Sequence, residues 1–537
     1  MAVDIAGLIS VIVFYVIILA VGIWAGRKTA RSKESDDIFL ASRNLGGMVS
    51  FFTLAATMVG GGYINGSAEM MYSRGFLWTQ APIGYNCALC IAGLVFAPKV
   101  RQGNYITIFD PFQNKYGNRL GSLLFVPQLL GDLFWSASIL SALGASLSII
   151  LGIDGTITII VSACVAIGYT FFGGLYSVAF TDVIQMICIF AGLFVAFPFA
   201  LTNEAVDLSK LSDGVWQGSI QTREVGVYVD SYLLLIMGGI PWQVYYQRAL
   251  ACRTSNIARW ASVAGGVAAA VQAIPPMALG AAVAAANWNM TAYNTSTPLS
   301  PEQTSLVVPL ALQYLCPKVV SIIGLGAVSA AVMSSADSCV LSTASVLTHN
   351  IYANIIRPRA SHREKIWVMR ISILVSGALG TIVAISVSSI YGLFFLCSDL
   401  MYVINFPQLV CVLWISFSNT YGYLVGFIVG LGLRISAGEP LLGLPALLLF
   451  PGYDEELGQL FPFRSFTMVT GLLSTIMVSY VTNQLFLRKI LPKRLDFLRC
   501  VTSMEVTVDK ADIHDAQTKG EAIPLSENQK SDLAEDS

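Results

Sequence analysis

Three consecutive glycines interrupt an apolar segment near the start of the chain, in the run Thr57-Met-Val-Gly-Gly-Gly-Tyr63. The segment around them is long enough to cross a bilayer, and glycine strongly disfavours the interior of a helix. Backbone groups that lack helical hydrogen bonds cannot face lipid, because nothing in lipid replaces the lost bonds. The interruption is therefore tolerated only where the backbone lines a cavity inside a membrane protein.

A second apolar segment is interrupted at Met237-Gly-Gly-Ile-Pro-Trp242. Two interrupted segments in corresponding places of two halves are typical of the binding site of a secondary transporter. Residues 46–201 and 229–417 would each form a repeat of five spans, and an odd number of spans gives the repeats opposite orientations. The sequence therefore predicts an all-α membrane protein of the LeuT type, with inverted five-helix repeats and broken helices.

The composition agrees with a membrane protein that crosses the bilayer many times. Only 12% of the residues are charged, whereas soluble domains carry about 25%. A spanning helix needs about 20 apolar residues, and residues 1–490 contain about thirteen such segments. Residues 491–537 are polar and predict a disordered cytoplasmic tail. The predicted spans are 5–25, 46–72, 78–98, 121–150, 156–173, 176–200, 229–247, 258–286, 319–350, 367–388, 391–416, 421–436 and 465–487.

The distribution of basic residues predicts how the chain is oriented in the membrane. Basic residues follow the first, third, seventh, ninth and last spans, and include Arg27, Lys99, Arg248, Arg357 and Arg488. Loops rich in lysine and arginine face the cytoplasm. We therefore expect the N-terminus outside the cell and the C-terminus in the cytoplasm. Glycosylation sequons at Asn289 and Asn294 fall in a loop that is then exterior.

The ninth predicted span is rich in serine and could hold a monovalent cation. Ser334 and Ser335 offer hydroxyl oxygens and Ala331 offers a carbonyl. The first interruption would free carbonyls near Ala56 and Val59, and hard cations prefer such oxygen ligands. Small residues also serve simple helix packing in membranes. The two broken helices favour the ion site over packing alone.

Charged residues inside predicted spans are costly and are candidates for function. Asp337 lies deep in the serine-rich span and is the better candidate for binding a cation. Asp182 could be either a helix cap or a functional carboxylate. Asp132 precedes Trp135 by three residues, so the two share one helix face. The intramembrane carboxylates are Glu69, Asp132, Asp182, Asp337 and Asp399.

Three aromatic residues, Tyr85, Trp135 and Trp242, lie in spans that should line the cavity. A quaternary ammonium group donates no hydrogen bonds, so proteins hold it against aromatic faces. Membrane tryptophans also serve as anchors at the lipid–water interface. Trp135 and Trp242 lie too near the middle of their spans for that role, so we predict a cage for a cation.

Several motifs together resemble the sodium/solute symporter family, and in particular its choline-carrying branch. The resemblance covers about residues 5–490. It rests on Val59-Gly-Gly-Gly-Tyr-Ile-Asn-Gly66, Gln80-Ala-Pro-Ile-Gly-Tyr85, Gly173-Gly-Leu-Tyr-Ser-Val-Ala179, Gly238-Gly-Ile-Pro-Trp-Gln243, the run from Gly324 to Ser338, and Phe406-Pro-Gln408. The glycine and serine pattern alone would also fit carriers of sugar or iodide.

The resemblance implies a sodium-driven, chloride-dependent importer of choline in the plasma membrane, with synaptic vesicles as a further location. We expect a small-molecule substrate and the lipid bilayer as partners and no nucleic acid, and the sequence contains no catalytic constellation that would indicate an enzyme. The motifs place no chloride site and leave the oligomeric state open. The residues implied are Ala56, Val59, Ala331, Ser334 and Ser335 for one sodium, Asp182, Asp337 and Ser338 for a further sodium, and Tyr85, Trp135 and Trp242 for choline.

One residue departs from the pattern of the choline branch, which has tryptophan where this chain has Met58. Methionine is polarizable but has no aromatic face. The cage would then lose a wall worth about 0.5–2 kcal/mol, or about two- to thirtyfold in affinity. Two alternatives follow from this difference. The chain could carry another cationic or zwitterionic solute, or it could be a sensor with a transporter fold that binds ligand without net uptake.

Overall fold

The computed structural model describes residues 5–29, 39–40, 43–171, 175–212, 214–293, 295, 298–455 and 457–498. Over these residues the protein is built from helices, and its only β-pairing consists of isolated bridges. Nine described helical stretches are long and apolar enough to cross a membrane, and a bent pair makes ten. Shorter apolar helices lie at Gly7–Gly22, Gly155–Gly168 and Thr420–Ser436, where the sequence predicts further spans. The protein is thus a multi-pass membrane protein, and the number thirteen stays a prediction.

The first predicted break lies between α3 (Gly47–Met58) and α4 (Gly61–Arg74), which meet at 46°. The amide of Gly60 donates to the carbonyl of Met58 at 3.0 Å. In a continuous helix it would donate to the carbonyl of Ala56. Residues 53–69 are all buried. The break therefore lies inside the protein, as its cost in lipid requires.

The second predicted break lies between α13 (Val225–Gly238) and α14 (Gln243–Ala251). Pro241 has no backbone N–H to continue the helical ladder, and Trp242 adopts an extended conformation with φ −88° and ψ 126°. Gly238 to Trp242 are buried. Both breaks are confirmed, although the inverted relation of the two repeats stays a prediction.

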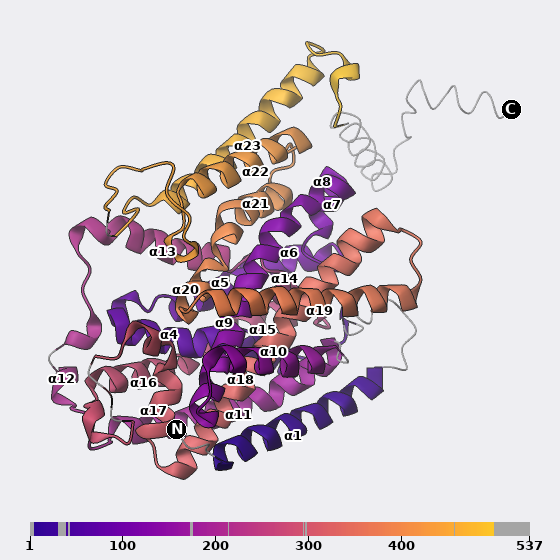
Figure 1. Ribbon diagram of the computed structural model, residues 1–537. Coiled ribbons are helices and arrows are strands. Elements are labelled where there is room, and N and C mark those ends of the chain that lie inside the picture. Colours follow the sequence, from indigo (N-terminus) through magenta and orange to yellow (C-terminus); the bar gives the residue numbers. More distant parts are fainter. Residues whose placement is uncertain are drawn as a thin grey trace.

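Long helices pack around the first break. The centre is formed by α9 (Phe125–Leu151), α11 (Leu175–Leu201) and α18 (Lys318–Val346), and α1 (Ile5–Thr29) lies along α11 and α18 at the lower edge of Figure 1. The contact between α11 and α18 is close at Gly192, where a Cβ atom would lie 2.4 Å from the Cβ of Ala327. Small residues therefore let these two backbones approach each other.

The remaining helices surround this centre. The pair α22 and α23 lies side by side at the top of Figure 1. Their bounds, with those of the other helices used below, are α5 (Ala81–Ile91), α7 (Asp110–Tyr116), α10 (Gly155–Thr170), α15 (Ser255–Gln272), α16 (Ile274–Ala285), α19 (His362–Ser386), α20 (Ile390–Leu396), α21 (Phe406–Trp414), α22 (Thr420–Ser436) and α23 (Phe463–Leu487).

A carboxylate joins the two predicted repeats. Glu69 of α4 accepts hydrogen bonds from the hydroxyl of Ser389 at 2.7 Å and from the amides of Ile390 and Tyr391 at 2.9 and 3.0 Å. These amides belong to the first turn of α20, whose N–H groups have no partner within the helix. Glu69 is therefore a helix-capping carboxylate shared between α4 and α20.

Candidate functional site

The first break meets α18 at Ser335. A Cβ atom at Gly60 would lie 2.0 Å from the Oγ of Ser335 and 4.0 Å from the carbonyl oxygen of Ala331. The Oγ of Ser335 is also 3.4 Å from the carbonyl oxygen of Thr57. Ala56, Val59, Ala331, Ser334 and Ser335 are all fully buried. The structure thus brings the break that holds Ala56 and Val59 against the predicted face of α18.

Ser334 faces a carboxylate on α11. Its hydroxyl donates to Oδ1 of Asp182 at 2.5 Å, and the hydroxyl of Thr53 donates to Oδ2 of the same carboxylate. A hydroxyl that donates its hydrogen keeps lone pairs that can bind a cation. Carboxylate, hydroxyl and carbonyl oxygens are the ligands that hard cations prefer. The residues present at this junction therefore fit a monovalent cation.

The residues implied for a further sodium surround Arg248 of α14. One guanidinium nitrogen, Nη2, lies 3.8 Å from Oδ2 of Asp182 and donates to the hydroxyl of Ser338. Asp337 accepts a hydrogen bond from Thr170 at 2.6 Å through Oδ1, and no described residue donates to its buried Oδ2. In this conformation Arg248 supplies the positive charge beside Asp182 and Ser338.

Arg248 itself corrects the sequence analysis, which assigned it to a basic cytoplasmic loop. The structure places it inside α14 with a side chain that is fully buried. Helix α14 continues to Ala251, so Arg248 lies one turn before its end, and Asp182 provides the opposite charge that burial requires. Two features of the sequence could have indicated that Arg248 is buried. These are the low hydropathy of Gln243–Ala251 and the presence of Asp182 in an apolar span without an opposite charge nearby in sequence.

The three predicted aromatic residues form one buried cluster. The rings of Tyr85 and Trp242 are stacked with centroids 5.9 Å apart, and those of Trp135 and Trp242 are 4.9 Å apart. Each of the three is at most 2% exposed. Rings at this separation are in contact. A quaternary ammonium group between them therefore requires the rings to separate.

Two further residues lie at these features: Met58 at the first break, and Phe394 beside the aromatic cluster. Met58 is the last residue of α3 and is buried. Phe394 of α20 has its ring centroid 4.8 Å from that of Tyr85, and its carbonyl accepts the Tyr85 hydroxyl at 2.9 Å. The sequence analysis missed Phe394, because nothing distinguishes it from the other phenylalanines in apolar segments.

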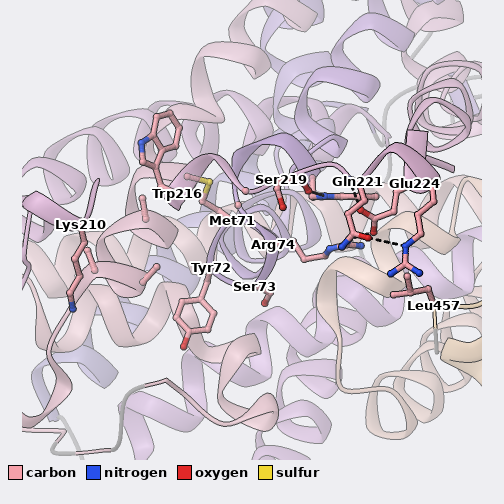
Figure 2. Close-up of a pocket in the computed structure, with 17 residues that line it drawn as sticks. Met71, Tyr72, Ser73, Arg74, Lys210, Trp216, Ser219, Gln221, Glu224 and Leu457 are labelled. Carbon is pink, nitrogen blue, oxygen red and sulfur yellow. Dashed lines mark hydrogen bonds and ion pairs between the residues drawn. The ribbon is translucent and has the colours of Figure 1, made fainter. Parts of the chain in front are cut away.

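A separate cavity of about 660 Å³ opens at the predicted outer end of the molecule (Figure 2). Arg74 crosses it, with a guanidinium nitrogen 2.8 Å from Oε1 of Glu224 and the guanidinium carbon 3.7 Å from the centroid of Trp78. The residues that line the cavity include none of the aromatic cluster. It is therefore a surface cavity distinct from the predicted binding site.

The two predicted glycosylation sites have different outcomes. Asn289 lies in the short helical turn Trp288–Met290 and is exposed, as an acceptor must be. Asn294 lies outside the described residues. Glycosylation at both positions stays a prediction.

Known proteins are similar to this chain in sequence. The sequence model of the sodium:solute symporter family matches residues 38–430. The chain is 48% identical to "High-affinity choline transporter 1" of Drosophila melanogaster, over 97% of this chain and 85% of that protein. It is 49% identical to the Caenorhabditis elegans protein of the same name, over 94% and 90%. It is 46% identical to "High affinity choline transporter 1" of Homo sapiens, over 98% and 93%.

A solved structure shares the fold. The substrate-bound, outward-open state of a Na⁺-coupled sialic acid symporter superposes with a TM-score of 0.71 at 18% identity, over 89% of this chain and 97% of that one. At this identity the similarity concerns the fold alone. The family match covers well over half of the chain, and the relatives above are similar along nearly their whole length. The chain therefore belongs to the sodium:solute symporter family.

Proposed function

We propose that the protein imports choline together with sodium. The observation that carries the substrate is the buried cluster of Tyr85, Trp135 and Trp242, whose aromatic faces suit a quaternary ammonium group. The names of the relatives support the same substrate. Membership of the symporter family, and the transporter names of these relatives, exclude an enzyme.

In this proposal sodium binds where the first break meets α18, between the carbonyls of Ala56 and Val59 and the hydroxyls of Ser334 and Ser335. Bound sodium would link the two predicted repeats and favour a state in which the aromatic rings are separated. Choline would then enter between the rings, and closure would expose both ions to the cytoplasm. Each positive charge that moves inward gains about 2.3 kcal/mol per 100 mV of membrane potential.

We propose a plasma-membrane location, with the N-terminus outside and the C-terminus in the cytoplasm, from the basic loops and the exposed Asn289. Vesicle membranes remain a second proposed location. Chloride dependence is proposed from the family resemblance alone, and no chloride site is assigned.

The deciding experiment is uptake of radiolabelled choline into cells that express the chain, with sodium and with sodium replaced by N-methylglucamine. Sodium-dependent accumulation above control cells is expected. Replacing chloride by gluconate tests the chloride dependence separately. Absence of accumulation, with the protein confirmed at the cell surface, would contradict the proposal.

Met58 supports a second candidate, a carrier of a different cationic or zwitterionic solute. The variant Met58→Trp separates the two possibilities. An increase in choline affinity would agree with a choline site that lacks one wall. Choline transport that appears only in this variant would favour another natural substrate, and binding without accumulation would favour a sensor.

A further inference from the structure

Asp132 is a buried carboxylate that belongs neither to the proposed sodium site nor to the aromatic cluster. It lies on α9, three residues before Trp135, and its exposed fraction is 2%. Residues three apart on a helix are neighbours on one face. The carboxylate is therefore about one helical turn from the aromatic cluster.

Within the described residues, the polar contacts of Asp132 are with neutral groups. The amide nitrogen of Gln128 donates to Oδ1 at 2.7 Å, and the hydroxyl of Thr343 lies 2.6 Å from Oδ2. The thiol of Cys339 contacts the Asp132 carbonyl at 3.2 Å. Across the described parts of the chain, no basic side chain forms an ion pair with Asp132.

The neighbouring hydrogen bonds allow the charge on Asp132 to change. The hydroxyl of Thr343 is also 3.1 Å from the carbonyl of Cys339, and its single hydrogen can serve only one of the two acceptors. When it serves the carbonyl, a protonated Asp132 can donate to Thr343. When it serves Asp132, both carboxylate oxygens accept hydrogen bonds and the group can be ionised, and a buried ionised carboxylate requires a nearby positive charge.

Two of the other four intramembrane carboxylates have basic partners. Asp182 faces Arg248, and Asp399 is bound by Arg434 and Arg464 at 2.7 and 3.0 Å. Asp132 has no such cation, and the proposed cage lies one turn away on the same helix. The sodium junction at Ser335 is farther, because it lies two turns before Thr343 along α18. Of the two ions in the proposed transport, the substrate would therefore place its positive charge nearer to Asp132 than sodium would, and Arg248 is already engaged by Asp182 and Ser338.

We propose that Asp132 is the counter-charge of the substrate and determines specificity for cations. This inference rests on the proposed function. It implies that a neutral analogue of the same shape binds more weakly, and that a zwitterion with its own carboxylate is repelled. In this proposal the carboxylate of Asp132 attracts the positive charge of the substrate without touching it. The aromatic rings make the direct contact with the substrate.

The test compares choline with 3,3-dimethyl-1-butanol, its neutral isostere, and with betaine as competitors of radiolabelled choline uptake. In the unaltered protein choline should compete far better than either analogue. In Asp132→Asn the ratio of choline to isostere potency should fall at least tenfold, while the sodium concentration for half-maximal uptake stays unchanged. A ratio that stays unchanged, with or without a change in sodium dependence, would overturn the inference.

The variant Thr343→Val is the matched control, because it removes one hydrogen-bond donor and keeps the carboxylate. It should retain the potency ratio. If Asp132→Asn does not reach the surface, Asp132→Ser and Asp132→Glu are purified in detergent, and thermal stabilisation by choline and by the isostere gives the same ratio. Of these two variants, only Asp132→Glu should keep the choline-to-isostere ratio of the unaltered protein. Absent choline uptake by the unaltered protein would refute the proposed function, whereas normal uptake with an unchanged ratio would refute only the role of Asp132.

Discussion

The guanidinium of Arg248 lies 3.8 Å from the carboxylate of Asp182, from Nη2 to Oδ2, and neither side chain has any exposed surface. The pair joins α14, which follows the second break, to α11, and Asp182 is bonded to Ser334 at the predicted sodium junction. Asp182 therefore links the charge of Arg248 to the hydroxyl of Ser334, which is expected to bind sodium. The break in one predicted repeat and the sodium junction are physically connected through these two residues.

Replacing Arg248 by methionine should destabilise the protein, because it leaves the charge of Asp182 buried without a partner. The cost of breaking a buried pair in this way is about 3–5 kcal/mol. We expect lower surface expression and a lower unfolding temperature in detergent. The double variant Arg248→Met with Asp182→Asn should recover part of the lost stability, and a double variant no more stable than Arg248→Met would contradict the pairing.

Replacing Ser335 by alanine should raise the sodium concentration needed for half-maximal uptake. Loss of one oxygen ligand worth about 1.4 kcal/mol corresponds to a tenfold change. The measurement is choline uptake against sodium concentration. Ser329→Ala is the matched control, because Ser329 is buried in the same helix, away from the break, and its hydroxyl donates to the carbonyl of Leu325 within that helix. Equal sodium dependence in both variants would count against the site.

Gly60 tests the close approach between the break and α18. A Cβ atom there would lie 2.0 Å from the Oγ of Ser335, so Gly60→Ala must push the two elements apart. We expect loss of uptake with protein still at the surface. Gly47→Ala, at the start of α3 where nothing lies within 4 Å, should behave as the unaltered protein. Normal uptake by Gly60→Ala would show that this contact is dispensable.

Trp242 contacts both other rings of the cluster, stacked on Tyr85 and tilted against Trp135, so its replacement should affect choline binding more than a change at either neighbour. Trp242→Leu removes an aromatic face worth about 0.5–2 kcal/mol and should raise the KM for choline about two- to thirtyfold. Trp242→Phe keeps an aromatic face, so its KM for choline should lie between those of the unaltered protein and Trp242→Leu. The measurement is the KM for choline uptake at saturating sodium. A KM for Trp242→Leu equal to that of the unaltered protein would exclude Trp242 from the binding site.

Lys115 should make stability depend on pH in the alkaline range. It lies on α7, between two spans, and its ammonium group donates to the carbonyl of Ile415 beyond the end of α21 at 2.6 Å. Burial lowers the pKa of Lys115 to about 8 from 10.5. Between these values the unfolded chain binds more protons, so this group makes the folded state more stable as pH rises.

The measurement is the unfolding temperature of the purified protein from pH 7 to 10, compared with Lys115→Met. The difference between the two proteins should change in favour of the unaltered protein above about pH 8. A difference that is constant across this range would show that Lys115 has an ordinary pKa.

Features that depend on a few adjacent residues could be predicted from the sequence. The glycine run before Tyr63 and the glycines and proline before Trp242 break their helices through local backbone preference, and both breaks occur where expected. The association of Tyr85, Trp135 and Trp242 was also predicted, because all three lie in spans expected to line the cavity and match the aromatic cage that the family resemblance implies.

Features that depend on tertiary contacts could not be predicted. Arg248 is adjacent in sequence to a basic loop, and only its tertiary contact with Asp182 of α11 reveals that it is buried as part of a pair. Phe394 becomes part of the aromatic cluster because α20 packs against α4 and α9 and brings its ring to Tyr85. Neither contact leaves a periodic or compositional signal in the chain.

The capping of α20 by Glu69 has a mechanical consequence. Three hydrogen bonds fasten the predicted outer part of α4 to the first turn of α20, and the Tyr85 hydroxyl ties α5 to the same helix at Phe394. These segments move as one rigid block unless all of these bonds break together. In the proposed transport cycle we therefore expect the flexible joints to be the two short unwound stretches, at Gly60 between α3 and α4 and at Gly239–Trp242 between α13 and α14.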